Sequence, residues 1–167
     1  MIRVDIETIV MAGGSVPSII VLRERGSSTS SEAPMRALSI QTGSYEAASI
    51  SRGVHGERAG RPIAHDVLVE ALEQLGAKIA RVEIDRVESP VFYAKLVITD
   101  DEGDEHAVDA RPSDAIAVAV RTNAPIYVED DVMNRAGSTS SFRSKEDDEE
   151  EFQRFDEFVQ TLSPDDF

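Results

Sequence analysis

Two short segments of the chain place acidic and basic side chains directly before an apolar stretch. Residues 109–121 read DARPSDAIAVAVR, and residues 61–76 read RPIAHDVLVEALEQLG. Each segment starts with polar residues and a proline and continues with apolar residues at helical spacing, which is typical of a helix start. Carboxylates at such a position gain from the helix dipole and from unpaired backbone N–H groups. We therefore expect one polar site to form where the two helices begin.

The first segment offers two carboxylates and a guanidinium. Asp109 would end a strand, and Asp114 would lie in the first turn of the following helix. Carboxylates suit Mg²⁺ or Mn²⁺, and a planar guanidinium suits phosphate. Asp109 and Asp114 could thus share a divalent cation that activates water, while Arg111 binds a phosphate. A structural alternative stays open, in which Asp114 or Ser113 caps the helix and Arg111 pairs with a carboxylate.

The second segment adds a histidine to these groups. His65 stands beside Asp66 and close to Arg61, so it could act as a general base, a general acid or a metal ligand. A hydrogen-bonded structural histidine is the alternative. Glu46, at the start of a short predicted helix, is a third carboxylate that could ligate a metal or simply cap its helix.

The elements that position these residues alternate between strands and helices without a regular βαβ repeat. The pattern predicts an α+β fold, with a meandering and mostly antiparallel sheet, two or three packed helices and a C-terminal amphipathic helix. Strands are predicted over 1–11, 18–23, 36–41, 78–87, 91–99, 106–110 and 125–128, and helices over 45–52, 62–75 and 112–122.

Length and charge divide the chain into a body and a tail. The 167 residues carry a net charge of −15. Residues 1–137 hold 14 Lys and Arg against 22 Asp and Glu, whereas residues 138–167 hold 3 against 10. We expect one domain over 1–137, followed by an acidic linker and helix over 138–167. The acidic body lacks the basic footprint of a tight nucleic-acid binder, so such binding would need a local basic groove, a metal ion or brief contact.

The tail has an amphipathic pattern of its own. Residues 145–162 are predicted to form a helix, because Phe152, Phe155, Val159 and Leu162 recur there at helical spacing among many acids. A helix docked on its own body or on a neighbouring subunit explains this pattern, and a regulatory or partner-binding tail is the alternative.

Several classes of protein are disfavoured by what the sequence lacks. The absence of cysteine excludes disulfides and thiol catalysis. No apolar run is long enough to cross a bilayer, and the first residues do not have the pattern of a signal peptide, so we expect a cytoplasmic protein that does not enter membranes. The phosphate-binding and hydrolase motifs GxGxxG, Walker A, HExxH and GxSxG are also absent.

The two segments, together with VFYAKLVI and the later APIYV, resemble the bifunctional nuclease family from about Met1 to Gly137. The closing FDEFVQTLSPDDF is similar to the end of bacterial members. The resemblance implies a compact α+β domain that forms a wedge-shaped homodimer, a groove as the active site, and degradation of both DNA and RNA. Six positions match the family motifs: the candidate catalytic residues His65, Asp66, Asp109 and Asp114, and the candidate substrate-binding residues Arg61 and Arg111.

One stretch departs from the family pattern. The family has a run similar to Leu-Pro-Ile-Trp-Ile-Gly before the Glu-Ala helix, but residues 38–43 here read LSIQTG. Proline and tryptophan are absent, whereas Gly43 and Glu46 remain. If the family's tryptophan lines the groove or stacks on a base, we expect this chain to be altered in activity or to have lost it.

Three functions follow from these features. The first is a nuclease that hydrolyses phosphodiester bonds of DNA and RNA with low sequence specificity, assisted by Mg²⁺ or Mn²⁺. The second is a non-catalytic dimeric regulatory or interaction module with an acidic tail. The third is a hydrolase for a small phosphorylated molecule, which an acidic surface would tolerate better than a long nucleic acid.

Overall fold

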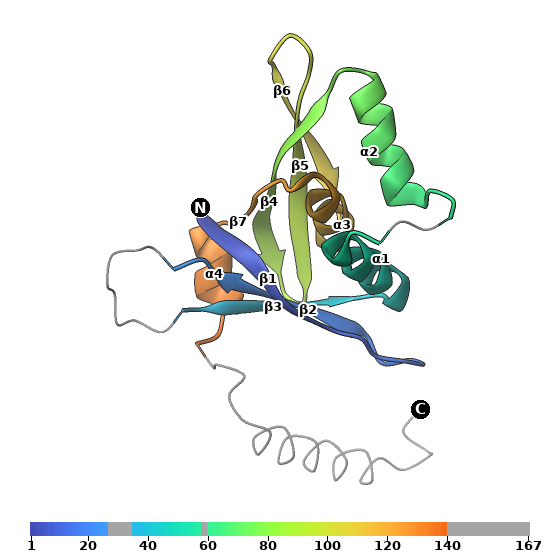
Figure 1. Cartoon of the computed structure of the whole chain (residues 1–167). Helices are drawn as coiled ribbons and strands as arrows, with labels where there is room; N and C mark the ends of the chain where they lie inside the picture. Colours follow the sequence, from blue (N-terminus) through green and yellow to red (C-terminus); the bar gives the residue numbers. More distant parts are fainter. Residues whose placement is uncertain (27–34, 58–59, 140–167) are drawn as a thin grey trace, which may run out of the picture.

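A single curved sheet forms the centre of the molecule (Figure 1). The computed structural model describes residues 1–26, 35–57 and 60–139. Within these residues the sheet has seven strands in the order β3-β2-β1-β7-β4-β5-β6. The helix predicted over 145–162 lies outside the described residues.

The strands form two antiparallel groups. Their bounds are β1 (Ile2–Val10), β2 (Ser18–Glu24), β3 (Ala37–Thr42), β4 (Lys78–Glu88), β5 (Val91–Thr99), β6 (Glu105–Ala110) and β7 (Ile126–Val128). The short β7 joins the groups, since it pairs antiparallel to β1 and parallel to β4. The predicted α+β fold with a mostly antiparallel sheet is confirmed.

Four helices accompany the sheet in the described part of the chain, α1 (Ser44–His55), α2 (Ala64–Gln74), α3 (Pro112–Thr122) and α4 (Asp130–Ala136). The first three gather on one side of the sheet, whereas α4 lies apart from them against β3 and β4 (Figure 1). Helix α3 begins with proline at its first position and ends at Asn123 in the left-handed conformation, with φ of 54°. The sequence did not predict α4, because its seven residues offer too short an apolar pattern.

The core is aliphatic and includes almost the whole of α3. Residues 115–119 are buried along this helix, against Val82, Ile84 and Leu96 of the sheet. Helix α1 packs on α3 at Gly53, where an added Cβ would lie 2.4 Å from Cγ2 of Val120. The contact therefore needs a residue without a side chain, and it brings the polar faces of α1 and α3 together.

Helix α2 is packed much less tightly than α3. His65 is its only buried residue, whereas Val67, Leu68 and Leu75 are exposed. It therefore contributes little to the core beyond its first turn.

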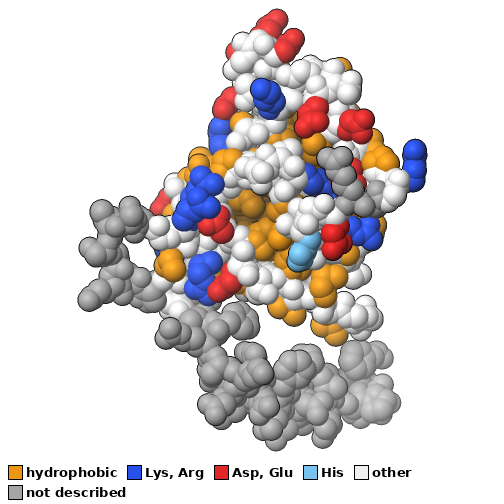
Figure 2. Space-filling view, viewed as in Figure 1, with side chains coloured by type: hydrophobic (Ala, Val, Ile, Leu, Met, Phe, Trp, Pro, Cys, Tyr) orange, Lys and Arg blue, Asp and Glu red, His pale blue; other side chains and the backbone are white. Residues whose placement is uncertain are grey.

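One face of the molecule shows side chains of both charge signs around a hydrophobic centre (Figure 2). The basic side chains do not form a continuous stripe on this face, in line with the acidic composition. Among the described residues, none of the helices has the length and apolarity needed to span a membrane.

Candidate functional site

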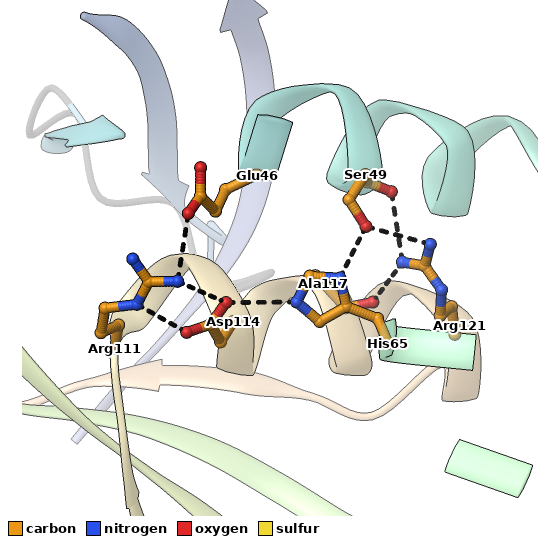
Figure 3. A network of polar contacts seen from close by, with 7 residues as sticks. All are labelled: Glu46, Ser49, His65, Arg111, Asp114, Ala117 and Arg121. Carbon is orange, nitrogen blue, oxygen red and sulfur yellow. Dashed lines mark hydrogen bonds and ion pairs between the residues drawn. The ribbon is translucent and has the colours of Figure 1, made fainter. Parts of the chain in front are cut away.

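The starts of α2 and α3 meet beside α1 and form one polar cluster (Figure 3). His65 lies in the first turn of α2, and its Nε2 is 3.2 Å from Oδ1 of Asp114 in the first turn of α3. The helix that carries His65 begins at Ala64, two residues later than predicted. The polar cluster comprises Glu46, Ser49, His65, Asp66, Arg111, Asp114 and Arg121.

The exposed end of the cluster is formed by Arg111 between two carboxylates. Its Nε donates to Oδ2 of Asp114 at 2.7 Å, and its Nη2 donates to Oδ1 of Asp114 and to Oε1 of Glu46, both at 3.1 Å. The Arg111 side chain is 66% exposed, so part of its guanidinium faces solvent. The hydrogen bond that Arg111 donates to Asp114 raises the pKa of Arg111 above its ordinary value. A cation with a free edge at this place can bind an oxyanion.

Asp114 receives hydrogen bonds from two sides. Partial burial alone would raise its pKa, but hydrogen bonds from Arg111 and His65 outweigh burial and hold the pKa of Asp114 below the ordinary value. Its side chain is 35% exposed. Asp114 is therefore an ionised carboxylate that water can reach.

His65 lies behind Asp114, away from solvent. The residue is 7% exposed, and its Nδ1 lies 2.8 Å from the hydroxyl of Ser49 on α1. Both ring nitrogens thus have partners within the protein. The ring links all three helices, because Ser49 is on α1 and Asp114 is on α3.

The inner end of the cluster is an ion pair between Asp66 and Arg121. Arg121 donates from Nε to Oδ1 of Asp66 at 2.6 Å, and Oδ2 of Asp66 accepts the backbone N–H of Ile63 at 2.9 Å. These two hydrogen bonds, that from Arg121 first, lower the pKa of Asp66. Asp66 therefore caps its own helix and ties it to α3, and its carboxylate is used in those contacts.

Two residues of the predicted site lie outside this cluster. Asp109 stands opposite Lys95 in the β5–β6 pairing, while its neighbour Ala110 stands opposite the buried Ala94 and packs on the core. Successive side chains of a strand point to opposite faces, so Asp109 lies on the face away from the core and from Asp114. Arg61 is exposed before α2, without a hydrogen bond or ion pair to the described residues.

No group of three or more His, Asp or Glu side chains suited to a metal occurs in the described ranges. The carboxylates of Glu46 and Asp114 share the guanidinium of Arg111 instead. Asp109 lies on the outer face of β6, whereas Asp114 lies in the polar cluster. Their placement therefore does not support the predicted sharing of one cation.

Sequence reasoning assigned no role to Ser49 or Arg121, although both are central to the cluster. Arg121 also donates from Nη1 to the carbonyl of Ala117 and from Nη2 to the hydroxyl of Ser49. Two signals were present in the sequence. A serine lies among the apolar positions of the first helix, and an arginine follows an uninterrupted apolar stretch.

Comparisons with known proteins identify the class to which this fold and site belong. A family model described as the bifunctional nuclease domain matches residues 28–141, a range that includes the whole polar cluster. The chain therefore belongs to the bifunctional nuclease domain family.

Relatives of two kinds share this sequence pattern. Uncharacterized proteins from two strains of Mycobacterium tuberculosis are 37% identical over 138 residues, covering 79% of this chain and 81% of theirs. A rice protein named bifunctional nuclease 2 is 32% identical over 114 residues, which cover 67% of this chain and 33% of that protein. This chain thus matches about a third of the rice protein's length.

Proposed function

We propose that this protein is a nuclease that hydrolyses phosphodiester bonds of DNA and RNA with low sequence specificity. The observation that carries the proposal is the convergence of Arg111 and His65 on one partly exposed carboxylate, that of Asp114. The rice relative named bifunctional nuclease 2 supports the same class of activity.

Each group of the exposed end has a role in this reaction. The free edge of Arg111 would bind the non-bridging oxygens of a phosphodiester and offset the charge that develops on them. Asp114, with its lowered pKa, would orient an attacking water rather than retain its proton. The water oxygen forms the new bond to phosphorus as the bond to the leaving sugar oxygen breaks. One water proton is released, and the leaving oxygen takes up one proton.

The remaining cluster residues would support these two groups. Glu46 holds the guanidinium of Arg111 from the side of α1. His65 contacts Asp114 from the buried side, and Asp66 keeps the start of α2 in place through Arg121. Fixed neighbours of this kind reduce the reorganisation needed during the reaction.

The acidic body limits how the substrate can be held. With eight more acids than bases over residues 1–137, long-range attraction to a polyanion is absent. We therefore expect brief contacts and weak binding. Assistance by Mg²⁺ or Mn²⁺ stays a prediction, which a comparison of cleavage in EDTA with cleavage in either ion tests.

The decisive experiment measures cleavage of short DNA and RNA oligonucleotides by the purified full chain. Asp114→Asn should lower the rate about 100-fold or more. The matched control is Asp131→Asn, since Asp131 also lies in a first helical turn and pairs with an arginine, 3.4 Å away. Asp109→Asn tests whether the reaction takes place instead on the opposite face of the sheet, where Asp109 lies. Activity that survives Asp114→Asn but not Asp109→Asn would place the reaction elsewhere.

A non-catalytic regulatory or interaction module is the second candidate. Its support is the bracing within the cluster, where the Asp66–Arg121 and Asp114–His65 contacts each join two helices. In that case Asp114→Asn would lower the melting temperature strongly, and the parent protein would leave the oligonucleotides intact.

We also propose that the protein is a homodimer formed through α2. Ala64, Leu68, Ala71 and Leu75 are exposed at spacings of four, three and four residues, and we call them the α2 stripe. This spacing is that of a seam between two paired helices, and a two-fold axis would place the same stripe on both sides. Pairing two copies would bury an apolar face that the described chain leaves exposed.

A further inference from the structure

Ser49 is the least exposed member of the polar cluster. It is 2% exposed and lies in the middle of α1. Its hydroxyl contacts both Nη2 of Arg121, at 3.1 Å, and Nδ1 of His65, at 2.8 Å (Figure 3). A nucleophilic role is excluded by this burial, because no substrate could approach the oxygen.

The direction of each hydrogen bond follows from the chemistry of the groups. A guanidinium can only donate, so the Ser49 oxygen accepts from Arg121. The hydroxyl hydrogen of Ser49 is then free to donate to Nδ1 of His65, which accepts it when the proton of the neutral ring is on Nε2. A neutral imidazole that accepts at Nδ1 carries its proton on Nε2, and this N–H points to Oδ1 of Asp114.

The opposite tautomer would be unfavourable here. With the proton on Nδ1, the lone pair of Nε2 would face the ionised carboxylate of Asp114 at 3.2 Å. Two acceptors would then face each other without a hydrogen, and one buried group would lose its hydrogen bond.

We propose that Ser49, held by Arg121, is a positioning residue that fixes the neutral ring of His65 as the Nε2–H tautomer. The ring thus serves as a donor to Asp114 and not as the base that contacts water. One oxygen of Asp114 is held by His65 and Arg111 together, and the other is held by Arg111 alone. The effect on hydrolysis rests on the proposed function, whereas the tautomer does not.

The test reads the tautomer directly by nitrogen NMR of the histidine rings, at a pH where the rings are neutral. In the parent protein, Nδ1 of His65 should have the ¹⁵N chemical shift of an unprotonated ring nitrogen, and Nε2 should have that of a protonated one. Ser49→Ala removes the donor to Nδ1 and should raise the fraction of His65 rings that carry the proton on Nδ1, and Ser49→Thr, which keeps the hydroxyl, should restore the parent signal.

The same spectrum contains an internal control. Nδ1 of His55 lies 2.7 Å from the carbonyl oxygen of Ser51, which can only accept, so neutral His55 should carry its proton on Nδ1. His55 should therefore show the opposite tautomer to His65 and should not respond to Ser49→Ala. Should Ser49→Ala fail to fold, Arg121→Lys removes the guanidinium that holds the Ser49 hydroxyl and should change the tautomer of His65 in the same direction.

Activity supplies a second measurement. Ser49→Ala should lower kcat roughly 10-fold or more with little change in KM, and Ser49→Thr should recover most of it. A parent His65 with its proton on Nδ1, or a tautomer unchanged by Ser49→Ala, would overturn the inference. A fixed Nε2–H tautomer in a protein that cleaves neither DNA nor RNA would instead reject the proposed function and leave the inference standing.

Discussion

His65 and Asp114 are 49 residues apart in the chain, yet Nε2 of the ring lies 3.2 Å from Oδ1 of the carboxylate. The contact joins the first turn of α2 to the first turn of α3. Asp114 thus stands between a buried donor, His65, and an exposed donor, Arg111. A single carboxylate links the interior of the three-helix group to the surface, and the proposed chemistry depends on it.

The guanidinium of Arg111 should matter for its shape as well as its charge. Arg111→Lys keeps the positive charge but loses the planar set of N–H donors that contacts Asp114 and Glu46. We expect KM for a short oligonucleotide to rise about 10-fold, since a hydrogen bond to a charged group contributes about 1.5–3 kcal/mol. Steady-state kinetics on the oligonucleotide measure this. Arg135→Lys is the control, because Arg135 forms an exposed pair in α4, and an equal effect of both variants would contradict the role of Arg111.

The Asp66–Arg121 pair should make stability depend on pH in acid. Because the folded protein lowers the pKa of Asp66, the pair stabilises the fold fully above the ordinary value of 3.8. This contribution is lost as the pH falls through the lower folded value. Asp66→Asn should therefore reduce the free energy of unfolding at pH 7, and the difference from the parent should shrink as the pH falls below 3.8. Urea denaturation across this range measures both values, and a difference that does not vary with pH would reject the explanation.

The close contact of α1 with α3 should fail when Gly53 gains a side chain. Alanine favours a helix over glycine by up to about 1 kcal/mol. However, its Cβ would lie 2.4 Å from Cγ2 of Val120 and 3.0 Å from Nη1 of Arg121. Overpacking of this kind costs about 1–3 kcal/mol, so we expect Gly53→Ala to be destabilising overall.

A double-mutant cycle isolates the cause of that loss. In a Val120→Ala background, Gly53→Ala should cost much less, because the clashing methyl group is gone. Thermal and urea unfolding of the four proteins supply the energies. An equal cost in both backgrounds would assign the effect to the helix itself rather than to its contact with α3.

Most of the fold could be predicted because its elements have strong local signals. The alternation in 78–99 and the proline at the start of α3 identify their elements directly. The place of β7 between β1 and β4 could not be predicted, because three residues carry no pairing information. Helix α4 was missed for the same reason, since Val132 and Met133 alone give it no periodicity.

For the site too, local sequence patterns predicted some residues, whereas contacts between distant parts of the chain could not be predicted. The helix dipole and the proline-led starts identified His65, Arg111 and Asp114, which do meet. Sequence reasoning placed Asp109 beside Asp114 because they are close in the chain, but strand alternation directs Asp109 to the other face. Ser49 acquires its partners only from tertiary packing, so no local pattern could assign its role.

The α2 stripe should control the oligomeric state. Leu68 and Leu75 are both exposed, and Leu75 is the C-cap residue that directly follows α2. In an antiparallel pair of α2 helices, Leu68→Glu and Leu75→Glu together would introduce four carboxylates into the interface. Each would lie against an apolar side chain or against another carboxylate of the partner copy. We expect the double variant to dissociate about 100-fold more readily while its circular dichroism stays that of the parent. Sedimentation velocity over a concentration series measures the change.

Val16→Glu is the control, since Val16 is an equally exposed apolar residue in the turn between β1 and β2. A parent that is monomeric at all concentrations, or a dimer that persists in the double variant, would show that α2 is not the interface.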